Sequence, residues 1–380
     1  MARQRTVEAE IEAPPEADRL EGWPHPRETL QVRGHAGAEA VIAEAIGSDR
    51  LHHAWLMTGE QGIGKATFAY RAARFLLAQE HDKLPSSVRS LDTEEGSRTA
   101  RQVANRSHPG LLTIKRGWDT AGKKSRQSIA IDDIRQLRHF LQRTAVTPWR
   151  VVIVDSADDL NLNSANALLK SLEEPPARTV FFLISSSPGR LLPTIRSRCR
   201  TIRFEPLPDT ALREAVLAAC RTVEREAPDD AQLATLLSVA RGSPRRVLQF
   251  LDGGGLALYD AIVTLLESLP RLDRAALHKL IALTAQRDGI AYAVAFDLLE
   301  ETIAAILRAR AAGLAVDQEF PRLRHFSTLI APDSLADWAE LWETIRDARG
   351  EAERLNLDKA ALTLTVFEKL ESLSRKGSRT

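Results

Sequence analysis

Two uninterrupted apolar segments limit the fold of this 380-residue chain more than any other feature. They are residues 151–154 (VVIV) and 180–184 (VFFLI), and neither alternates polar with apolar residues as a half-exposed strand does. Between them lies an apolar stripe with helical spacing that stops at Pro175. Strands that are apolar on both faces and are separated by helices indicate a parallel sheet covered by helices. The sequence therefore predicts an α/β domain.

The same pattern divides the chain into domains. Residues 53–58, 111–114 and 201–204 are the other predicted strands, and polar residues 80–110 resemble an insertion. The pattern breaks at Glu205-Pro-Leu-Pro-Asp209 and at Gly253-Gly-Gly255, which are typical of linkers. We therefore expect a disordered tail and three domains. Their predicted ranges are 1–23 for the tail, 24–205 for the α/β domain, 206–254 for a small helical domain and 255–380 for an all-α domain.

Composition excludes several classes of protein. The chain has 52 basic and 51 acidic residues, so net charge does not indicate a strong nucleic-acid binder. Two cysteines, Cys199 and Cys220, provide neither a disulfide framework nor a four-ligand zinc site. No apolar run approaches the roughly 20 residues that cross a bilayer, and the N-terminus lacks the apolar core of a signal peptide. We predict a cytoplasmic protein without a membrane anchor or zinc.

A phosphate-binding motif lies between a predicted strand and a predicted helix. Gly59-Glu-Gln-Gly62-Ile-Gly64-Lys65 fits the pattern G-x-x-x-x-G-K. In such a loop, backbone N–H groups and the following helix N-terminus bind phosphate oxygens, while the lysine neutralises their charge. The position after the lysine normally carries Ser or Thr for Mg²⁺, but here it is Ala66. Thr67 is one residue later, about 100° around the helix, and points elsewhere.

The second part of a nucleotide site is also incomplete. Asp155 ends the 151–154 strand, where a carboxylate for Mg²⁺ is expected, although it could instead be a capping or solvated carboxylate. The next residue is Ser156, and a hydroxyl cannot act as a general base near neutral pH without activation. ATP or ADP could therefore bind weakly at this site without being hydrolysed.

Five motifs resemble the AAA+ clamp-loader family. Their positions are Ser197-Arg198-Cys199, residues 165–176 (ANALLKSLEEPP), 52–56 (HHAWL), 242–245 (GSPR) and 356–358 (NLD). ATP-hydrolysing members of this family carry a glutamate at the position of Ser156. The absence of this glutamate together with a retained Ser-Arg-Cys motif resembles the delta-prime branch of bacterial DNA polymerase III. The resemblance implies an AAA+ P-loop domain, a helical lid and a helical collar.

The resemblance also implies a function for particular residues. Arg198 would act in trans in the ATP site of a neighbouring subunit, with Ser197 and Cys199 at that interface. Arg245 would correspond to the sensor 2 arginine that faces nucleotide. The implied partners are the gamma/tau motor subunits, the delta subunit, the sliding clamp and primed DNA. The implied complex is the DNA polymerase III holoenzyme, a nucleotidyltransferase, in which this chain would be a stator.

Several alternatives stay open at this stage. Arg198 could be a structural ion-pair partner, and Arg245 with Arg246 could be solvated charges. The chain could be an ATP-hydrolysing motor subunit or another AAA+ ATPase, or a free-standing nucleic-acid-binding protein. Relatives often carry a four-cysteine zinc module after the P-loop helix, but residues 80–110 contain no cysteine, and His81 with His108 are too few ligands.

Overall fold

The chain forms two compact units, residues 1–225 and 226–380, in a computed structural model. The described residues are 16, 18–48, 50–79, 84–85, 87–119, 124–126, 128–144, 146–285, 289–314, 316, 320–355 and 357–377. The first unit contains α1 (Ala36–Gly47), β1 (Ala54–Thr58), α2 (Lys65–Leu77), α3 (Arg98–Ala104), β2 (Leu111–Ile114), β3 (Trp118–Asp119), β4 (Lys124–Ser125), α4 (Ile131–Gln142), β5 (Arg150–Val154), η1 (Ala157–Asp159), α5 (Leu162–Glu173), β6 (Thr179–Ser185), η2 (Pro188–Arg190), α6 (Pro193–Arg196), β7 (Arg200–Arg203) and α7 (Asp209–Thr222).

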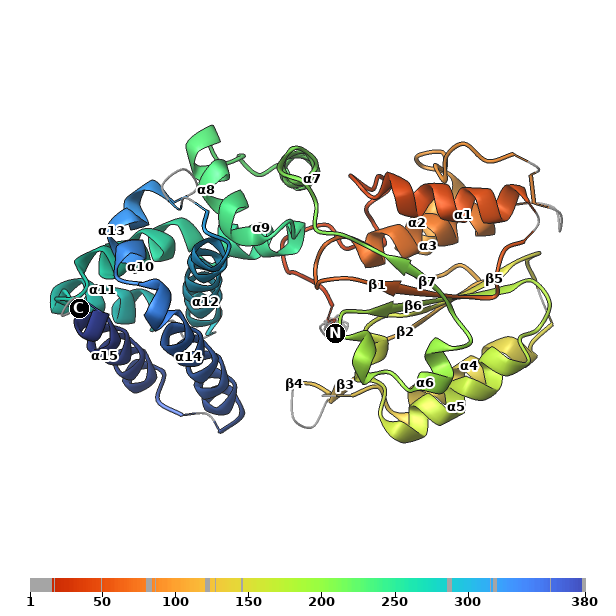
Figure 1. Cartoon of the computed structure of the whole chain (residues 1–380). Helices are drawn as coiled ribbons and strands as arrows, with labels where there is room; N and C mark the ends of the chain where they lie inside the picture. The colour runs from red at the N-terminus through yellow and green to blue at the C-terminus, as the bar shows by residue number, and fades with distance from the viewer. Residues whose placement is uncertain are drawn as a thin grey trace, which may run out of the picture. The chain divides into compact units, whose positions relative to one another are not determined.

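A five-stranded parallel sheet is the centre of the first unit, as predicted. Its strand order is β2-β5-β6-β1-β7, and every pairing is parallel. Helices α1, α2 and α3 cover one face, and α4, α5 and α6 cover the other (Figure 1). All five predicted strands are confirmed, each within two residues of its expected ends. The short antiparallel hairpin β3–β4 was not predicted.

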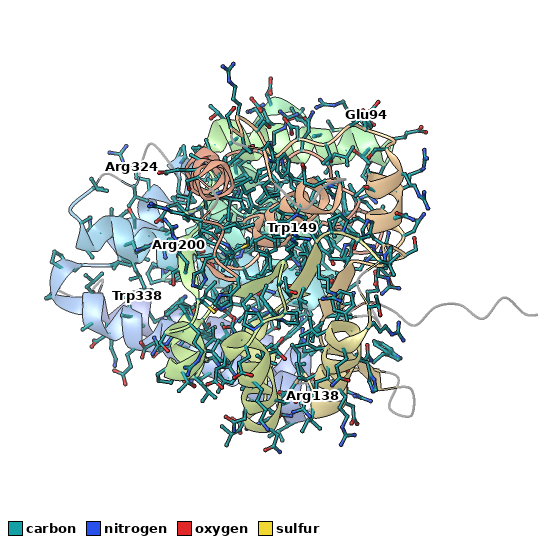
Figure 2. The ribbon with its side chains drawn as sticks, turned by 90° about the vertical axis from the view of Figure 1, so that its right-hand side faces the viewer. Glu94, Arg138, Trp149, Arg200, Arg324 and Trp338 are labelled. Carbon is teal, nitrogen blue, oxygen red and sulfur yellow. The ribbon has the colours of Figure 1, made fainter. Side chains whose placement is uncertain are left out.

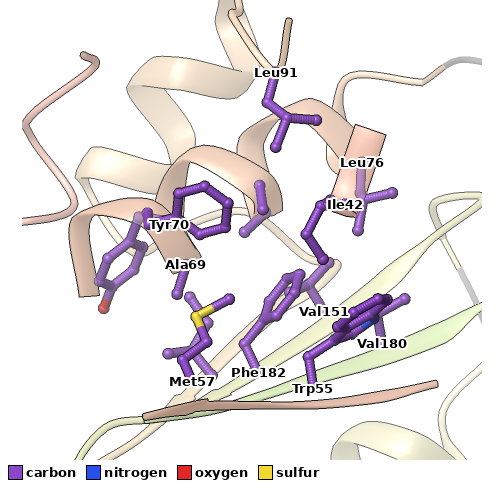
Figure 3. Packing of buried hydrophobic residues seen from close by; sticks show 14 of the residues in the cluster. Ile42, Trp55, Met57, Ala69, Tyr70, Leu76, Leu91, Val151, Val180 and Phe182 are labelled. Carbon is purple, nitrogen blue, oxygen red and sulfur yellow. The ribbon is translucent and has the colours of Figure 1, made fainter. Parts of the chain in front are cut away.

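Alternate residues of the central strands β1, β5 and β6 supply two separate hydrophobic cores. Trp55, Met57 and Phe182 face α1 and α2, as Figure 3 shows. Their neighbours Leu56 and Phe181 belong to the core beneath α4 and α5. Because successive strand residues point to opposite faces, a sheet covered on both sides needs apolar residues at every position. This requirement explains the uninterrupted apolar runs in the sequence.

The N-terminal boundary of the first unit differs from the prediction. We expected a disordered tail through residue 23, but Trp23 is buried and lies beneath the Arg225 guanidinium, 4.4 Å from the ring centroid. Glu16 forms ion pairs of 2.7 Å with Arg27 and 2.9 Å with Lys115. Burial alone would raise the pKa of Glu16, but these hydrogen bonds outweigh burial and lower it to about 2. Residues 1–15 and 17 of the predicted tail lie outside the described residues.

Part of the predicted insertion at 80–110 packs against the core of the first unit. It contains α3, and Leu91 and Val103 are buried against the core on the α2 side of the sheet. Asp92 of this segment also accepts a hydrogen bond from the buried Arg71 of α2, which bonds Glu39 of α1 as well. The described part of the insertion therefore covers the outer face of α2.

The second unit is helical throughout its described residues, as predicted for the C-terminal region. Its elements are α8 (Asp230–Ala240), α9 (Pro244–Asp252), α10 (Gly255–Ser268), α11 (Arg274–Thr284), α12 (Ile290–Ala311), η3 (Pro321–Leu323), α13 (Arg324–Thr328), η4 (Pro332–Ser334), α14 (Leu335–Leu355) and α15 (Lys359–Gly377). We expected one domain boundary near 205 and another at 253–255. Instead α7 groups with the sheet, and α8 and α9 group with α10 and α12 in one unit. Only Gly253 and Gly254 separate α9 from α10, and Gly254 adopts φ +67° in this tight turn.

The core of the first unit offers a test of the fold. Phe182→Ala removes a fully buried ring and should lower the free energy of unfolding by about 3–5 kcal/mol. Val146→Ala is a control, since Val146 is 82% exposed and should change stability by less than about 0.5 kcal/mol. Urea denaturation monitored by circular dichroism measures both. Equal midpoints for the two variants would contradict the assignment of Phe182 to the core.

Candidate nucleotide site and surface arginine

The predicted phosphate loop connects β1 to α2 at the carboxyl edge of the sheet. Gly59, Gly62 and Gly64 adopt φ values of +144°, +79° and +108°, which L side chains rarely adopt. A Cβ on Gly59 would lie 2.4 Å from the Phe204 carbonyl oxygen. Gly64 is the N-cap of α2, and no side chain caps this helix. The loop therefore has the backbone form that phosphate binding needs.

Lys65 is turned into this loop and is almost fully buried. Its Nζ donates to the carbonyl oxygens of Gly59 at 2.6 Å and Glu60 at 2.5 Å, and to Ser186 Oγ at 3.1 Å. Burial lowers the pKa of Lys65 to about 8, although the nearby Asp158, Asp155 and Glu60 carboxylates oppose this shift. The ammonium group is thus held by the protein's own oxygens at the position from which it can reach phosphate.

Asp155 follows β5, as predicted, and its backbone N–H bonds Ile114 of β2. Its carboxylate is close enough to Lys65 to affect the lysine's pKa. Ser156 adopts φ +60° and begins the short helix η1. The structure thus brings the loop, Lys65 and Asp155 together, but it places a hydroxyl where an ATPase needs a carboxylate.

Asp158 and Ser186 are site residues that the sequence analysis missed. The Asp158 carboxylate accepts hydrogen bonds from Ser185 Oγ and Ser186 N, both at 2.6 Å. This fixes the turn after β6, and Ser186 in turn bonds Lys65. The three-residue spacing from Asp155 to Asp158 was the available signal, because one turn of η1 returns the side chain to the sheet edge.

His35 supports the loop from α1. The residue is the N-cap of α1, and its Nε2 donates to the Ile63 carbonyl oxygen at 2.7 Å. Burial lowers the pKa of His35 and the Lys65 charge lowers it further, against the opposing effect of the Ile63 carbonyl. A neutral imidazole therefore bonds the loop backbone beside Gly64.

The Ser-Arg-Cys motif lies at the opposite edge of the sheet. Arg198 precedes β7, whose first residue Arg200 pairs with Trp55 at the beginning of β1. Gly59 follows the end of β1, so the Arg198 backbone is separated from the phosphate loop by roughly 15 Å of strand. Arg198 therefore cannot serve the site of its own chain. The role of Arg198 in a neighbouring site stays a prediction.

The three motif residues differ in exposure. Ser197 is exposed, and the Arg198 side chain is 36% exposed. Arg198 Nη2 pairs with Glu173 Oε1 at 2.8 Å, while Nη1 donates to the Thr194 carbonyl oxygen at 3.0 Å. Cys199 packs against the core under α5, and burial raises its pKa to about 12. Arg200, labelled in Figure 2, lies at the surface with its guanidinium 5.1 Å from the Trp55 ring centroid.

Arg245 and Arg246 lie in the first turn of α9 in the second unit. Ser243 caps this helix and Pro244 is its first residue. Arg246 Nη1 bonds Glu301 at 2.7 Å, so this arginine has a structural ion pair. The assignment of Arg245 to nucleotide stays a prediction. The Asn-Leu-Asp motif at 356–358 lies partly outside the described residues, since Asn356 is not described.

The fit of the site to nucleotide is partial. The glycine conformations and Lys65 suit an anionic phosphate chain, as shown above. Ala66 has no side-chain oxygen for Mg²⁺. Thr67 is half-buried and lies about 100° further around α2. Among the described residues, no three His, Cys, Asp or Glu side chains are grouped as metal ligands. His108 is buried and accepts a bond from Gly110 N, while His81 is outside the described residues.

The sheet order and the phosphate loop between β1 and α2 define an AAA+-type P-loop protein. A family model described as DNA polymerase III, delta subunit, matches residues 34–208. The delta-prime subunit of Pseudomonas aeruginosa DNA polymerase III is 34% identical over 221 residues, 57% of this chain and 61% of that relative. Over these ranges the chain is therefore similar to delta-type and delta-prime subunits of bacterial DNA polymerase III.

Motor-type subunits are also similar to this chain. The gamma/tau subunit of Mycobacterium tuberculosis is 32% identical over 234 residues, 60% of this chain and 37% of that subunit. Both alignments therefore span less than two thirds of the relative's length. A solved gamma subunit-related protein from Thermotoga maritima aligns over 87% of this chain and 98% of its own, with 19% identity and a TM-score of 0.41. Within the described residues, no helix is long and apolar enough to cross a membrane.

The buried lysine predicts a pH-dependent stability. The unfolded lysine keeps its proton up to about pH 10.5, whereas Lys65 in the folded chain loses it near 8. Between these values the unfolded state binds more protons, so stability rises with pH. We expect the free energy of unfolding of the native chain, minus that of Lys65→Met, to rise by roughly 1–2 kcal/mol from pH 7.5 to 9.5. A difference that stays flat in chemical denaturation would contradict this prediction.

Proposed function

We propose that this chain is the delta-prime stator of a clamp loader. It would hydrolyse no ATP itself and would place Arg198 in the ATP site of a neighbouring motor subunit. The observation that carries this proposal is the location of Arg198, at the surface and at the sheet edge opposite the phosphate loop. Ser156 and Ala66 support the other half of the proposal, because each removes a group that hydrolysis in cis needs.

The chemistry of the guanidinium suits this role. Charge develops on the γ-phosphate oxygens during phosphoryl transfer, and a planar guanidinium can donate two parallel hydrogen bonds to them. An arginine supplied by another subunit accelerates such reactions by about 10³–10⁵-fold. Of the five N–H groups of Arg198, two are engaged by Glu173 and Thr194. Three N–H groups are thus left for a phosphate.

The proposed partners follow from the family. They are the gamma/tau motor subunits and the delta subunit, with the sliding clamp and primed DNA engaged by the assembled complex. Because the net charge is near zero, strong DNA binding by the isolated chain is disfavoured. Contact with DNA would therefore be made by the assembled complex. We propose that this assembly works in the cytoplasm as part of the polymerase holoenzyme.

A motor subunit is the second candidate, because the gamma/tau alignment covers as much of this chain as the delta-prime alignment does. ATP turnover by the purified chain distinguishes the two functions. A motor subunit turns over ATP when purified alone, whereas the proposed stator does not. Turnover above background that is lost in Lys65→Met would favour the motor.

Arg198 provides the main test of the proposal. Arg198→Ala should lower the ATP turnover of the reconstituted clamp loader by at least about tenfold, because one transition-state contact is lost. Arg196→Ala is the matched control, since Arg196 is exposed on the same short helix α6. Steady-state ATPase assays with sliding clamp and primed DNA measure both variants. Full activity of the Arg198→Ala complex, with normal assembly on gel filtration, would reject the role in trans.

The degenerate site predicts a metal-independent nucleotide affinity. Without a hydroxyl at position 66, Mg²⁺ adds little to binding, so the affinity for ATP should change less than about twofold when EDTA is added. Lys65→Met should weaken binding at least tenfold, because the outer phosphates lose their cation. Fluorescence anisotropy with a labelled ATP analogue measures these affinities. Strong dependence on Mg²⁺ would contradict the interpretation of Ala66.

A further inference from the structure

The Arg198 side chain is fixed at both of its ends. Its backbone lies in a short turn, where Arg198 N bonds the Ile195 carbonyl oxygen at 3.1 Å. The next residue, Cys199, packs into the core beneath α5, so this turn cannot shift freely. The guanidinium is held by the Thr194 carbonyl oxygen and by Glu173. Of the two partners of the guanidinium, Thr194 contributes a backbone carbonyl oxygen and Glu173 a charged carboxylate.

The position of Glu173 is not explained by helix stability. Glu173 is the last residue of α5, where the helix dipole is negative and a carboxylate is unfavourable. Its neighbour Glu174 adds a second acidic residue at the same helix end. Glu173 is 47% exposed, so it fills no core space. Its 2.8 Å pair with Arg198 is the interaction that gives a carboxylate a purpose at this position.

Helices α5 and α6 pack against each other, so the two partners are mounted on one rigid support. His53 Nε2 bonds the Leu172 carbonyl oxygen at 3.0 Å, which ties the end of α5 to the beginning of β1. A long arginine side chain would otherwise sample many rotamers, and ordering it during the reaction would cost free energy. The pair with Glu173 limits this freedom before a neighbouring subunit arrives.

We propose that Glu173 is a positioning residue for the trans-acting arginine. It orients the Arg198 guanidinium so that the unused N–H groups point away from α5, toward the phosphates of a neighbouring ATP site. The inference rests on the proposed function, because Glu173 has this role only if Arg198 acts in trans. In this role Glu173 acts through Arg198.

A double-mutant cycle in the reconstituted clamp loader tests the inference. Glu173→Ala should lower the kcat for ATP about two- to fivefold, the range expected for one exposed ion pair, and should leave KM within twofold. Glu173→Gln keeps the shape and one acceptor oxygen, so it should recover part of the loss. Glu174→Ala is the matched control and should match the native complex. Thermal unfolding of each isolated variant checks that the chain is folded.

The cycle separates the inference from the proposed function. In an Arg198→Ala background, Glu173→Ala should have no further effect, because the group it positions is gone. An equal loss in both backgrounds would overturn the positioning role. Native turnover in Glu173→Ala, or faster turnover, would overturn it as well, while a defect in Arg198→Ala would keep the proposed function intact. Native turnover in Arg198→Ala would reject both.

Discussion

Burial of the parallel sheet on both faces is the constraint on which the first unit depends. It requires apolar residues at every position of the central strands, so polar groups are left only at the strand ends. The carboxyl ends carry the phosphate loop after β1, Asp155 after β5 and Ser186 after β6. The amino end of β7 carries Arg198. One sheet thus separates a nucleotide-type site from a surface arginine by the length of a strand.

The degenerate site is stabilised by interactions within the chain. Lys65 is bonded by loop carbonyl oxygens and by Ser186, and Asp158 holds the turn that carries Ser186. A buried ammonium group without such partners would be costly, so these bonds let the loop keep its form without a ligand. The loop conformation is therefore maintained although Ala66 and Ser156 depart from the usual motif.

Helix α5 is connected both to the Ser-Arg-Cys turn and to the beginning of β1. The α5 segment covers the lower face of the sheet, and its last residue, Glu173, reaches the Ser-Arg-Cys turn. Its preceding residue, Leu172, is bonded by His53 at the beginning of β1. These contacts give a physical reason for the 165–176 segment, which was first noted as a family motif. It fixes the support on which Arg198 is presented.

Some features were open to sequence reasoning because they depend on local pattern. Apolar runs and glycine spacing predicted all five strands of the sheet and the phosphate loop, since each depends on neighbours within a few residues. The tail boundary was misplaced because the residues that hold it are distant in sequence: Glu16 pairs with Lys115, and Trp23 with Arg225. The boundary at 253–255 was misplaced because glycines that end one helix resemble a flexible linker.

By itself, the sequence determined a doubly covered parallel sheet, a phosphate loop without its magnesium hydroxyl and an arginine in a recognisable motif. Tertiary structure decided which groups meet across the chain. It brought Asp158 to the turn after β6, Lys65 to Ser186 and Glu173 to Arg198, over separations of 28, 121 and 25 residues. The physical reason is that charge pairing and hydrogen bonding act at about 3 Å, while sequence pattern reports only on the next few turns of the chain.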